Sequence, residues 1–237
     1  MDIDDKFHDL IRTGGMKIKG RLVDASNATM LAKIDDGNDG IDVIYKPIAG
    51  ERPLWDFPHG SLADRELATY LLSFHTGVNL VPFTVMREGP FGLGAVQLWV
   101  DIDQEIDLIE YFQTDTPALR KMALFDAVIN NTDRKIGHIL PSKTGEVFGC
   151  DHGVTFHEEN KLRTVLWQWA GVPLSNDEIE LLVTIQSYVE SEAGIEFRTL
   201  LSQAEIDALL HRIHNLTAAK AFPHPSADWP SVPWPPF

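Results

Sequence analysis

Hydrophobic and polar residues alternate over the first part of the chain in the manner of β-strands. Between Met16 and Pro47 the sequence reads MKIKGRLV, a polar turn DASNAT, MLAKI, a loop rich in Asp, Gly and Asn, and IDVIYKP. Alternation over short runs that are bounded by turn-forming residues is typical of strands joined by tight connections. We therefore expect three short antiparallel strands in this segment.

A helix and a hairpin follow these strands. The segment SLADRELATYLLSFHTG begins with Ser61 and Asp64, which match a capping-box pattern, and it stops at Gly77, a residue type that commonly ends helices. This pattern predicts a helix of about four turns. The next segment, VPFTVMREGPFGLGAVQLWVD, predicts a hairpin that turns between Gly89 and Gly94.

The chain becomes helical after Asp101. The segment TPALRKMALFDAVINN has Thr116 as a helix N-cap and Pro117 at the first helical position. Two later helices are predicted to begin at Ser175 and Ser202, each of which is a favourable N-cap residue. The second half of the chain is therefore expected to consist mainly of helices.

This order of elements divides the chain near residue 103. We expect residues 1–103 to form a β-rich lobe with one helix and residues 104–222 to form a helical lobe, with a cleft where the two meet. Residues 223–237, PHPSADWPSVPWPPF, are too rich in proline for a regular helix. This tail either packs on the body through its tryptophans or extends as a partner-binding peptide.

The charge of the chain restricts its partners. There are 35 Asp and Glu residues against 20 Lys and Arg, which gives a formal net charge of -15. This charge repels nucleic-acid backbones and anionic lipids, so we expect no nucleic-acid partner and no stable membrane association. If the ligand is an anion such as a nucleotide, divalent cations would have to bridge it to the protein.

Cysteine content and hydropathy point to a cytoplasmic protein. The single Cys150 excludes an internal disulfide framework, and its place in VFGC is typical of a small buried apolar residue. The first residues are acidic without the apolar segment of a signal peptide, and nowhere do 18 apolar residues follow one another. We therefore expect a cytoplasmic location.

Two aspartates between Val128 and His157 indicate phosphoryl transfer. Asp133 follows the first long helix of the second lobe and Asp151 follows a short apolar strand, so both are expected to line the cleft. One carboxylate would position or deprotonate the acceptor and the other would hold Mg²⁺ on nucleotide phosphates. A lysine from the β-rich lobe would neutralise phosphate charge.

These residues resemble motifs of the protein-kinase-like superfamily, most closely its atypical branches, the phosphatidylinositol 3/4-kinases and the toxin kinases of the HipA type. NTDRKIGH is similar to their catalytic loop, and CDHG is similar to their Asp-Phe-Gly motif. With YKPIAGERPLWDFPHG and GPFGLGAVQLW, the chain also resembles a bacterial PI3/4-kinase-like family. The resemblance covers most of residues 16–170. It implies an α+β, bilobal protein-kinase-like fold that binds ATP with Mg²⁺ or Mn²⁺.

The resemblance assigns roles to three residues of the predicted catalytic loop. Asp133 matches the catalytic aspartate, and Lys135 matches the lysine that contacts the transferring phosphate in ordinary protein kinases. His138 stands where these families have a metal-binding Asn, five places after the Asp. Because imidazole is a poor ligand for Mg²⁺ but a good one for Mn²⁺, His138 as a ligand would shift metal preference toward Mn²⁺. Alternatively, His138 only packs or forms local hydrogen bonds.

The resemblance also assigns the metal aspartate and the residues that hold ATP. Asp151 matches the metal-binding aspartate of Asp-Phe-Gly. Lys46, at the end of a strand, matches the nucleotide lysine, and Glu66 on the first helix is its expected partner, with Asp64 as a competitor. A carboxylate on the apolar side of a helix should be paired, which favours this arrangement for Glu66.

Two further segments are expected at the nucleotide. The turn that contains Ser26 and Asn27 takes the place of the glycine-rich phosphate loop, and its backbone N–H groups would hold phosphates. The strand AVQLWVD is similar to the segment that connects the lobes of kinases, so backbone groups near Trp99 and Val100 are expected to bind adenine.

Three functions are compatible with this sequence. The first is an ATP-dependent kinase that acts on a protein or small-molecule acceptor. The second is transfer of AMP on the same fold with the nucleotide reversed. The third is a nucleotide-binding pseudokinase, which the replacement of the usual Asn by His138 keeps open. No segment of the sequence identifies the acceptor.

Overall fold

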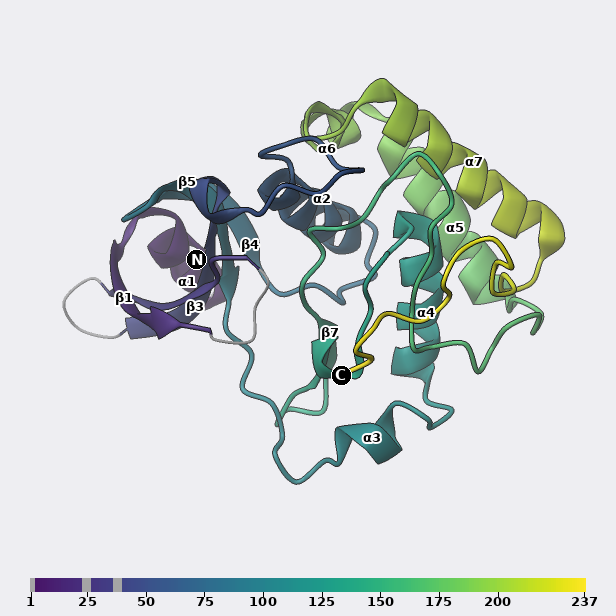
Figure 1. Cartoon of the computed structure of the whole chain (residues 1–237), viewed down its shortest axis with the longest axis horizontal. Coiled ribbons are helices and arrows are strands. Elements are labelled where there is room, and N and C mark those ends of the chain that lie inside the picture. Colours follow the sequence, from purple (N-terminus) through teal and green to yellow (C-terminus); the bar gives the residue numbers. More distant parts are fainter. Residues whose placement is uncertain (1–2, 23–26, 36–39) are drawn as a thin grey trace.

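The computed structural model describes residues 3–22, 27–35 and 40–237. Figure 1 shows a twisted sheet at one side of the molecule, a group of helices at the other side, and helix α2 between them. The sheet has five antiparallel strands in the order β1-β2-β3-β5-β4. Its strands are β1 (Gly15–Arg21), β2 (Met30–Asp35), β3 (Gly40–Pro47), β4 (Thr84–Gly89) and β5 (Gly92–Leu98).

The predicted strands are confirmed. Strands β1, β2 and β3 pair in sequence order, and β4 and β5 form the predicted hairpin. Hairpin strand β5 joins the other three by pairing with β3, which places Gly94 opposite Pro47. A Cβ atom at Gly94 would lie 2.4 Å from the carbonyl oxygen of Lys46, so a glycine is required for β5 to approach β3 here.

Helix α2 (Leu62–His75) lies at the predicted position, but its predicted capping box is wrong. Ser61 is the N-cap residue, yet its hydroxyl donates to the carbonyl of Pro58 and does not cap the helix. The carboxylate of Glu51 instead accepts the backbone N–H groups of Leu62 and Ala63. A side chain 11 residues upstream therefore satisfies the first turn of the helix, which no local pattern could indicate.

Helices dominate the second half of the chain, as predicted. Thr116 and Pro117 begin α4, and Ser175 and Ser202 cap α5 and α7 through their hydroxyl groups. The elements of this half are α3 (Leu108–Tyr111), α4 (Pro117–Ile129), β6 (Ile139–Pro141), β7 (Val147–Gly149), α5 (Asn176–Glu190), α6 (Ile195–Thr199) and α7 (Gln203–Ala219), with single-turn 3₁₀ helices at Ile48–Gly50, Ile136–His138 and Glu192–Gly194. A helix that was not predicted, α1 (Ile3–Thr13), packs near β2 and β4.

A continuous hydrophobic core joins the sheet to the helices. It runs from Ile34 and Val43 of the sheet through Leu72 of α2 to Val128 of α4 and Leu209 of α7. Eleven of the 14 residues of α2 are buried, because this helix contacts β4 and β5 on one side and α5 and α6 on the other. This packing holds α2 in a fixed position beside the junction of sheet and helices. The lobe boundary near residue 103 stays a prediction.

The C-terminal tail packs on the body of the molecule and ends beside β7 (Figure 1). The carbonyl of Ser231 accepts hydrogen bonds from the Thr164 N–H and the Trp167 indole, and the Ile136 N–H donates to the carbonyl of Pro236. Trp234, in contrast, is 86% exposed. The tail is therefore attached through its backbone and through Trp229, whose ring lies 5.1 Å from the Lys161 ammonium.

Among the helices of the described residues, none combines the length and the apolar character that a membrane crossing requires.

Candidate active site

Three charged side chains from distant parts of the chain meet between the sheet and the helices. Lys46 lies near the end of β3, Glu66 lies in the second turn of α2, and Asp151 follows β7. The Lys46 ammonium donates hydrogen bonds to Glu66 Oε1 and, at 2.8 Å, to Asp151 Oδ1. Glu66, and not its competitor Asp64, is therefore the partner of Lys46. We call this group of three the lysine junction.

The lysine junction is strongly polarised by its own charges. Burial alone would lower the pKa of Lys46, but the carboxylates of Asp151 and Glu66 more than offset this and raise it. The Lys46 charge in turn holds the pKa of Asp151 well below its usual range. Burial raises the pKa of Glu66, against the opposing effect of Lys46. An ammonium between two carboxylates thus stays protonated, which is the state that binds phosphate oxygens.

The backbone conformation of Asp151 contributes to this arrangement. Its φ is 58°, in the left-handed region that aspartate adopts more readily than most residues. Strained conformations of this kind concentrate at functional sites. Gly153, two residues after Asp151, lies against α2. A Cβ atom at this glycine would be 3.3 Å from the Leu62 side chain. The segment CDHG therefore places Asp151 in a tight turn and packs closely, through Gly153, on the helix that carries Glu66.

Asp133 faces the same cavity from the predicted catalytic loop. Its backbone N–H donates to the side-chain oxygen of Asn131, whose amide nitrogen donates to Asp126. The Lys135 ammonium lies 3.4 Å from Asp133 Oδ2. Burial raises the pKa of Asp133, and the charge of Lys135 opposes this rise. A partly buried carboxylate of raised pKa is suited to accept a proton from an acceptor hydroxyl.

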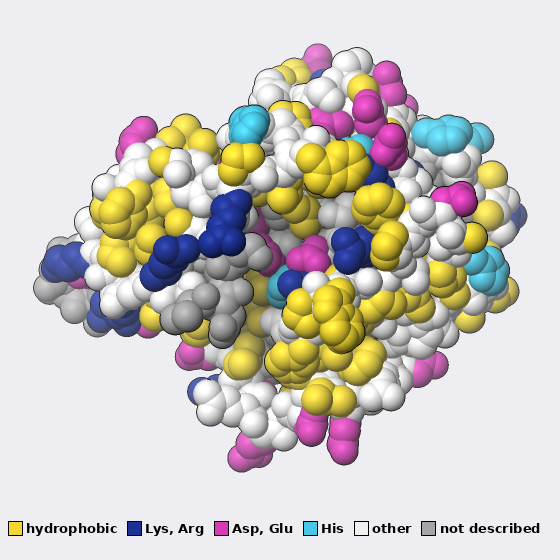
Figure 2. Space-filling view, viewed as in Figure 1, with side chains coloured by type: hydrophobic (Ala, Val, Ile, Leu, Met, Phe, Trp, Pro, Cys, Tyr) yellow, Lys and Arg dark blue, Asp and Glu magenta, His cyan; other side chains and the backbone are white. Residues whose placement is uncertain are grey.

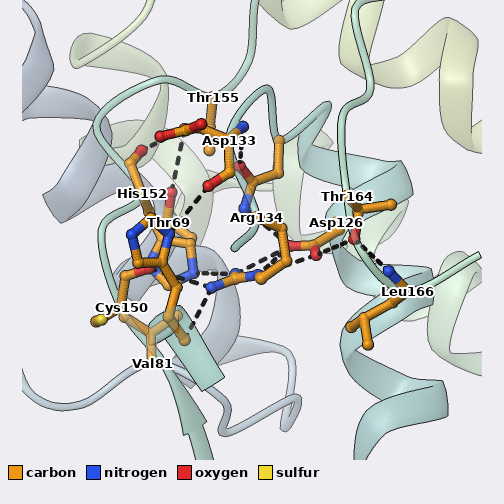
Figure 3. Close-up of polar contacts among 12 residues, drawn as sticks. Thr69, Val81, Asp126, Asp133, Arg134, Cys150, His152, Thr155, Thr164 and Leu166 are labelled. Carbon is orange, nitrogen blue, oxygen red and sulfur yellow. Dashed lines mark hydrogen bonds and ion pairs between the residues drawn. The ribbon is translucent and has the colours of Figure 1, made fainter. Parts of the chain in front are cut away.

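A buried arginine, Arg134, holds the predicted catalytic loop in place through hydrogen bonds to its surroundings (Figure 3). The Arg134 guanidinium donates to both carboxylate oxygens of Asp126 and to the carbonyls of His138 and Cys150. Figure 3 shows it enclosed between Asp126 on α4 and the segment around His152. Arg134 and Asp126 are both fully buried. This pair fixes the loop that carries Asp133 relative to the residue that precedes Asp151.

His138 points its free nitrogen toward Asp151. Its Nδ1 is hydrogen-bonded to the carbonyl of Asp133 at 2.9 Å, and its Nε2 lies 3.6 Å from Asp151 Oδ2. Burial lowers the pKa of His138 to about 4, so the ring is neutral at pH 7. Nδ1 lies between the Asp133 carbonyl, to which it donates in one tautomer, and the Lys135 N–H at 3.5 Å, which it accepts in the other. In the tautomer with the proton on Nδ1, the Nε2 lone pair faces the Asp151 carboxylate, and both atoms can then bind a cation.

This donor set fits a divalent cation. An imidazole nitrogen and a carboxylate oxygen together would suit Mn²⁺ better than Mg²⁺, and this metal preference stays a prediction. In the described chain, no three His, Cys, Asp or Glu side chains are arranged to hold a metal by themselves. The remaining ligands would have to be water and phosphate oxygens, which is usual for cations that accompany nucleotides.

The lysine junction and Asp133 line a cavity of about 380 Å³ between the sheet and the helices. Figure 2 shows this face of the molecule hollowed at its centre, with acidic side chains in the hollow and basic ones on both sides of it. Asn27 lies at the edge of the cavity, where its side-chain oxygen accepts the Arg52 N–H. Ser26 lies outside the described residues. The cavity therefore brings together Asn27, Lys46, Glu66, Asp133 and Asp151.

Trp99 and Val100 lie elsewhere. They line a separate hollow beside the C-terminal end of α2 and the β6–β7 turn, and not the cavity that contains the lysine junction. The Trp99 N–H already donates to the carbonyl of Asp42. The role of these two residues in binding adenine stays a prediction.

Several residues that shape the site were not singled out from the sequence. Asn131 and Arg134 flank Asp133 in NNTDR, so their proximity to the site was readable, but their partner Asp126 is hidden within α4. Arg163 and Trp229 also line the cavity, although they lie 30 and 96 residues after Asp133 in the sequence. Only the tertiary fold brings them there.

Comparison with known proteins identifies one close relative. Protein Rv2133c of Mycobacterium tuberculosis (strain ATCC 25618 / H37Rv) is 38% identical over 272 residues, which cover 100% of this chain and 98% of that protein. No protein-family model matches the chain.

Two solved structures share the fold. A crystal structure of the Golgi casein kinase matches with a TM-score of 0.55 and 12% sequence identity. The match covers 91% of this chain and 75% of the casein kinase chain. The same kinase with Mn/ADP bound has a TM-score of 0.56 and 13% identity, covering 92% and 76%. The chain therefore has a protein-kinase-like α+β fold, as the sequence resemblance implied.

Proposed function

We propose that this chain, which belongs to the same family as protein Rv2133c of Mycobacterium tuberculosis, is an ATP-dependent phosphotransferase. The lysine junction carries the proposal. A lysine held between a helix glutamate and an aspartate that follows a short strand is the arrangement by which protein kinases hold ATP phosphates and their metal. Here it occurs on a protein-kinase-like fold, with a second aspartate facing the same cavity.

Each residue of the site has a separate role in the proposed transfer of phosphate. Asp133 accepts the proton of the acceptor hydroxyl while the acceptor oxygen attacks the γ-phosphorus of ATP. The bond from that phosphorus to the bridging oxygen breaks, and ADP leaves with the electron pair. Lys46 and Lys135 stabilise the negative charge that is spread over the phosphate oxygens. Asn131 and the Arg134–Asp126 pair keep Asp133 in place through the contacts described above.

A divalent cation completes the proposal. Asp151 and His138 would hold it, and it would neutralise phosphate charge in a chain whose own formal charge is -15. The Golgi casein kinase, which has a similar fold, has been solved with Mn/ADP bound, and this supports binding of a nucleotide and a divalent metal by the present chain.

The finer parts of the proposal depend on the sequence motifs. Within the superfamily we place the chain near the PI3/4-kinase and HipA-type branches, because of the NTDRKIGH and CDHG segments. We propose a cytoplasmic enzyme with a protein or small-molecule acceptor. Its net negative charge argues against nucleic acid and lipid surfaces as partners.

Mass spectrometry of the purified protein after incubation with ATP and Mn²⁺ or Mg²⁺ tests this function. A covalent gain of one phosphate by the protein, or slow metal-dependent hydrolysis of ATP to ADP and inorganic phosphate, would support phosphoryl transfer. A gain of AMP would indicate the reversed nucleotide of the second function. Asp151→Ala is the control variant, because it removes the proposed metal carboxylate. Absence of any metal-dependent ATP binding in calorimetry would overturn the proposal, whereas binding without turnover would indicate a pseudokinase.

A further inference from the structure

Arg163 is an unusual arginine in this protein. Its backbone N–H donates to the carbonyl of Asn131, and its carbonyl accepts the N–H of Arg134, so it lies directly beside the loop of Asp133. Its side chain lines the cavity, and its Nε is buried without a hydrogen-bond partner. Within the described ranges, every other arginine that is at least partly buried donates a side-chain hydrogen bond, but the Arg163 guanidinium has neither a hydrogen bond nor an ion pair.

The charge of Arg163 opposes the rise that burial causes in the Asp133 pKa, but the two side chains form no hydrogen bond or ion pair. A partly buried guanidinium without a hydrogen-bonded anion is costly, and the cost is removed when an anion binds. The chain has 35 acidic residues, so a partner for Arg163 would have been easy to supply from the protein itself. Of the other two cations that line the cavity, Lys46 already pairs with two carboxylates and Arg52 is exposed. An arginine beside the proposed base whose guanidinium makes no hydrogen bond or ion pair in the described chain is therefore suited to an anion that enters from outside.

Aromatic side chains also line this cavity, and one of them, Trp55, is 84% exposed at its mouth. Trp55 and Phe57 come from the loop between β3 and α2, and Trp229 comes from the tail. The Lys161 ammonium joins these segments: it lies 4.7 Å from the Trp55 ring centroid and 5.1 Å from that of Trp229, and it donates to Asp56 at 3.0 Å. The loop before α2 and the C-terminal tail thus meet at Lys161 and line the same cavity as Arg163, and hydrophobic groups surround the hollow in Figure 2.

The size and lining of this cavity favour a compact acceptor. Peptides are commonly bound along an exposed strand edge or in an open groove, whereas small molecules are bound in concave sites with apolar walls and a few polar groups. The cavity of about 380 Å³ has this second character, and it must also hold the transferred phosphate. Flat aromatic walls fit the face of a ring, and guanidinium fits a phosphate or a carboxylate.

We propose that the acceptor is a small hydroxylated ring compound that carries an anionic group, which Arg163 binds while a hydroxyl of the compound lies at Asp133. This inference rests on the proposed phosphotransferase function and narrows its acceptor. The transfer step is unchanged: the acceptor hydroxyl loses its proton to Asp133, its oxygen takes the γ-phosphoryl group, and ADP leaves. Arg163 orients the acceptor and takes no part in bond making.

The test uses the full chain loaded with Mn²⁺ and a non-hydrolysable ATP analogue. Calorimetric titrations compare three probes of similar shape: glucose 6-phosphate, glucuronate and glucose, which carry a phosphate, a carboxylate and no charge. We expect at least one anionic probe to bind at least about tenfold more tightly than glucose. Arg163→Gln should weaken that binding by about 10- to 100-fold, the usual effect of losing a charged hydrogen-bond donor, and Arg163→Lys should restore part of it.

Arg12→Gln controls for the loss of one positive charge, because Arg12 lies on α1 in an exposed ion pair with Asp9. It should leave probe binding unchanged. A phosphate preference and a carboxylate preference each support the inference and identify the anion. Equal binding of all three probes, no binding of any, or equal affinities in wild type and Arg163→Gln would each overturn it.

The nucleotide titration separates this inference from the function on which it depends. If the protein binds the ATP analogue but Arg163→Gln weakens that binding as strongly as probe binding, Arg163 belongs to the nucleotide site and the inference is wrong. If wild type does not bind the analogue at all, the proposed function itself fails.

Discussion

Replacing Lys46 by methionine should both destabilise the protein and abolish transfer, and the two effects can be separated. The Glu66 side chain is only 3% exposed, so removal of Lys46 leaves a carboxylate in the interior without its partner. Breaking a buried ion pair in this way costs about 3–5 kcal/mol. For a chain of this size, about 2–4 °C is lost per kcal/mol, which gives a decrease in Tm of roughly 10 °C.

The double variant Lys46→Met/Glu66→Met is the decisive comparison. Two apolar side chains of similar volume in place of a buried pair are often neutral for stability. We therefore expect the double variant to recover at least about 2 kcal/mol relative to Lys46→Met, while transfer stays absent because nothing holds the phosphates.

Urea unfolding followed by tryptophan fluorescence at pH 7 measures these stabilities. Lys19→Met is the matched control, since Lys19 forms an exposed ion pair with Asp42 at 2.6 Å and its loss should cost less than about 1 kcal/mol. The reasoning is refuted if Lys46→Met is as stable as Lys19→Met, or if the double variant is no more stable than Lys46→Met alone.

Three further predictions follow from the site. Asp133→Asn should leave ATP affinity in calorimetry nearly unchanged but lower the transfer rate at least about a hundredfold; in wild type the rate should rise with pH through a pKa above that of an ordinary aspartate, since burial raises the Asp133 pKa and the carboxylate is the active form. His138→Asn should shift the preference of metal-dependent ATP binding from Mn²⁺ toward Mg²⁺, and identical metal titrations in both proteins would make His138 a packing residue. Burial raises the pKa of Cys150 to about 12, so its thiol should react with Ellman's reagent at pH 8 only after unfolding in urea; fast reaction of the native protein would contradict this.

Local patterns in the sequence were sufficient for most elements of the fold. The period-two alternation between Met16 and Pro47 became three paired strands, and the caps at Thr116, Ser175 and Ser202 begin helices at those positions. These features are determined by the backbone and by side chains within a few residues. Helix α1 was missed.

The sequence also predicted the chemistry of Lys46, Asp133 and Asp151, because their residue types and spacing along the chain indicated phosphoryl transfer. Their convergence could not be derived from that spacing, since Lys46 and Asp151 are 105 residues apart and meet only after the core has packed around α2. The same holds for Glu51, which caps α2 in place of the local Ser61.

The acceptor side of the cavity was decided by tertiary structure alone. Arg163 carries no motif, and in the sequence it looks like any charged residue of a loop. It became informative only because its guanidinium has no hydrogen bond or ion pair within the described chain, and because Lys161 contacts both Trp55 and Trp229 at the same cavity. Pairing and burial depend on which distant segments the hydrophobic core brings together, so a pattern of neighbours along the chain cannot encode them.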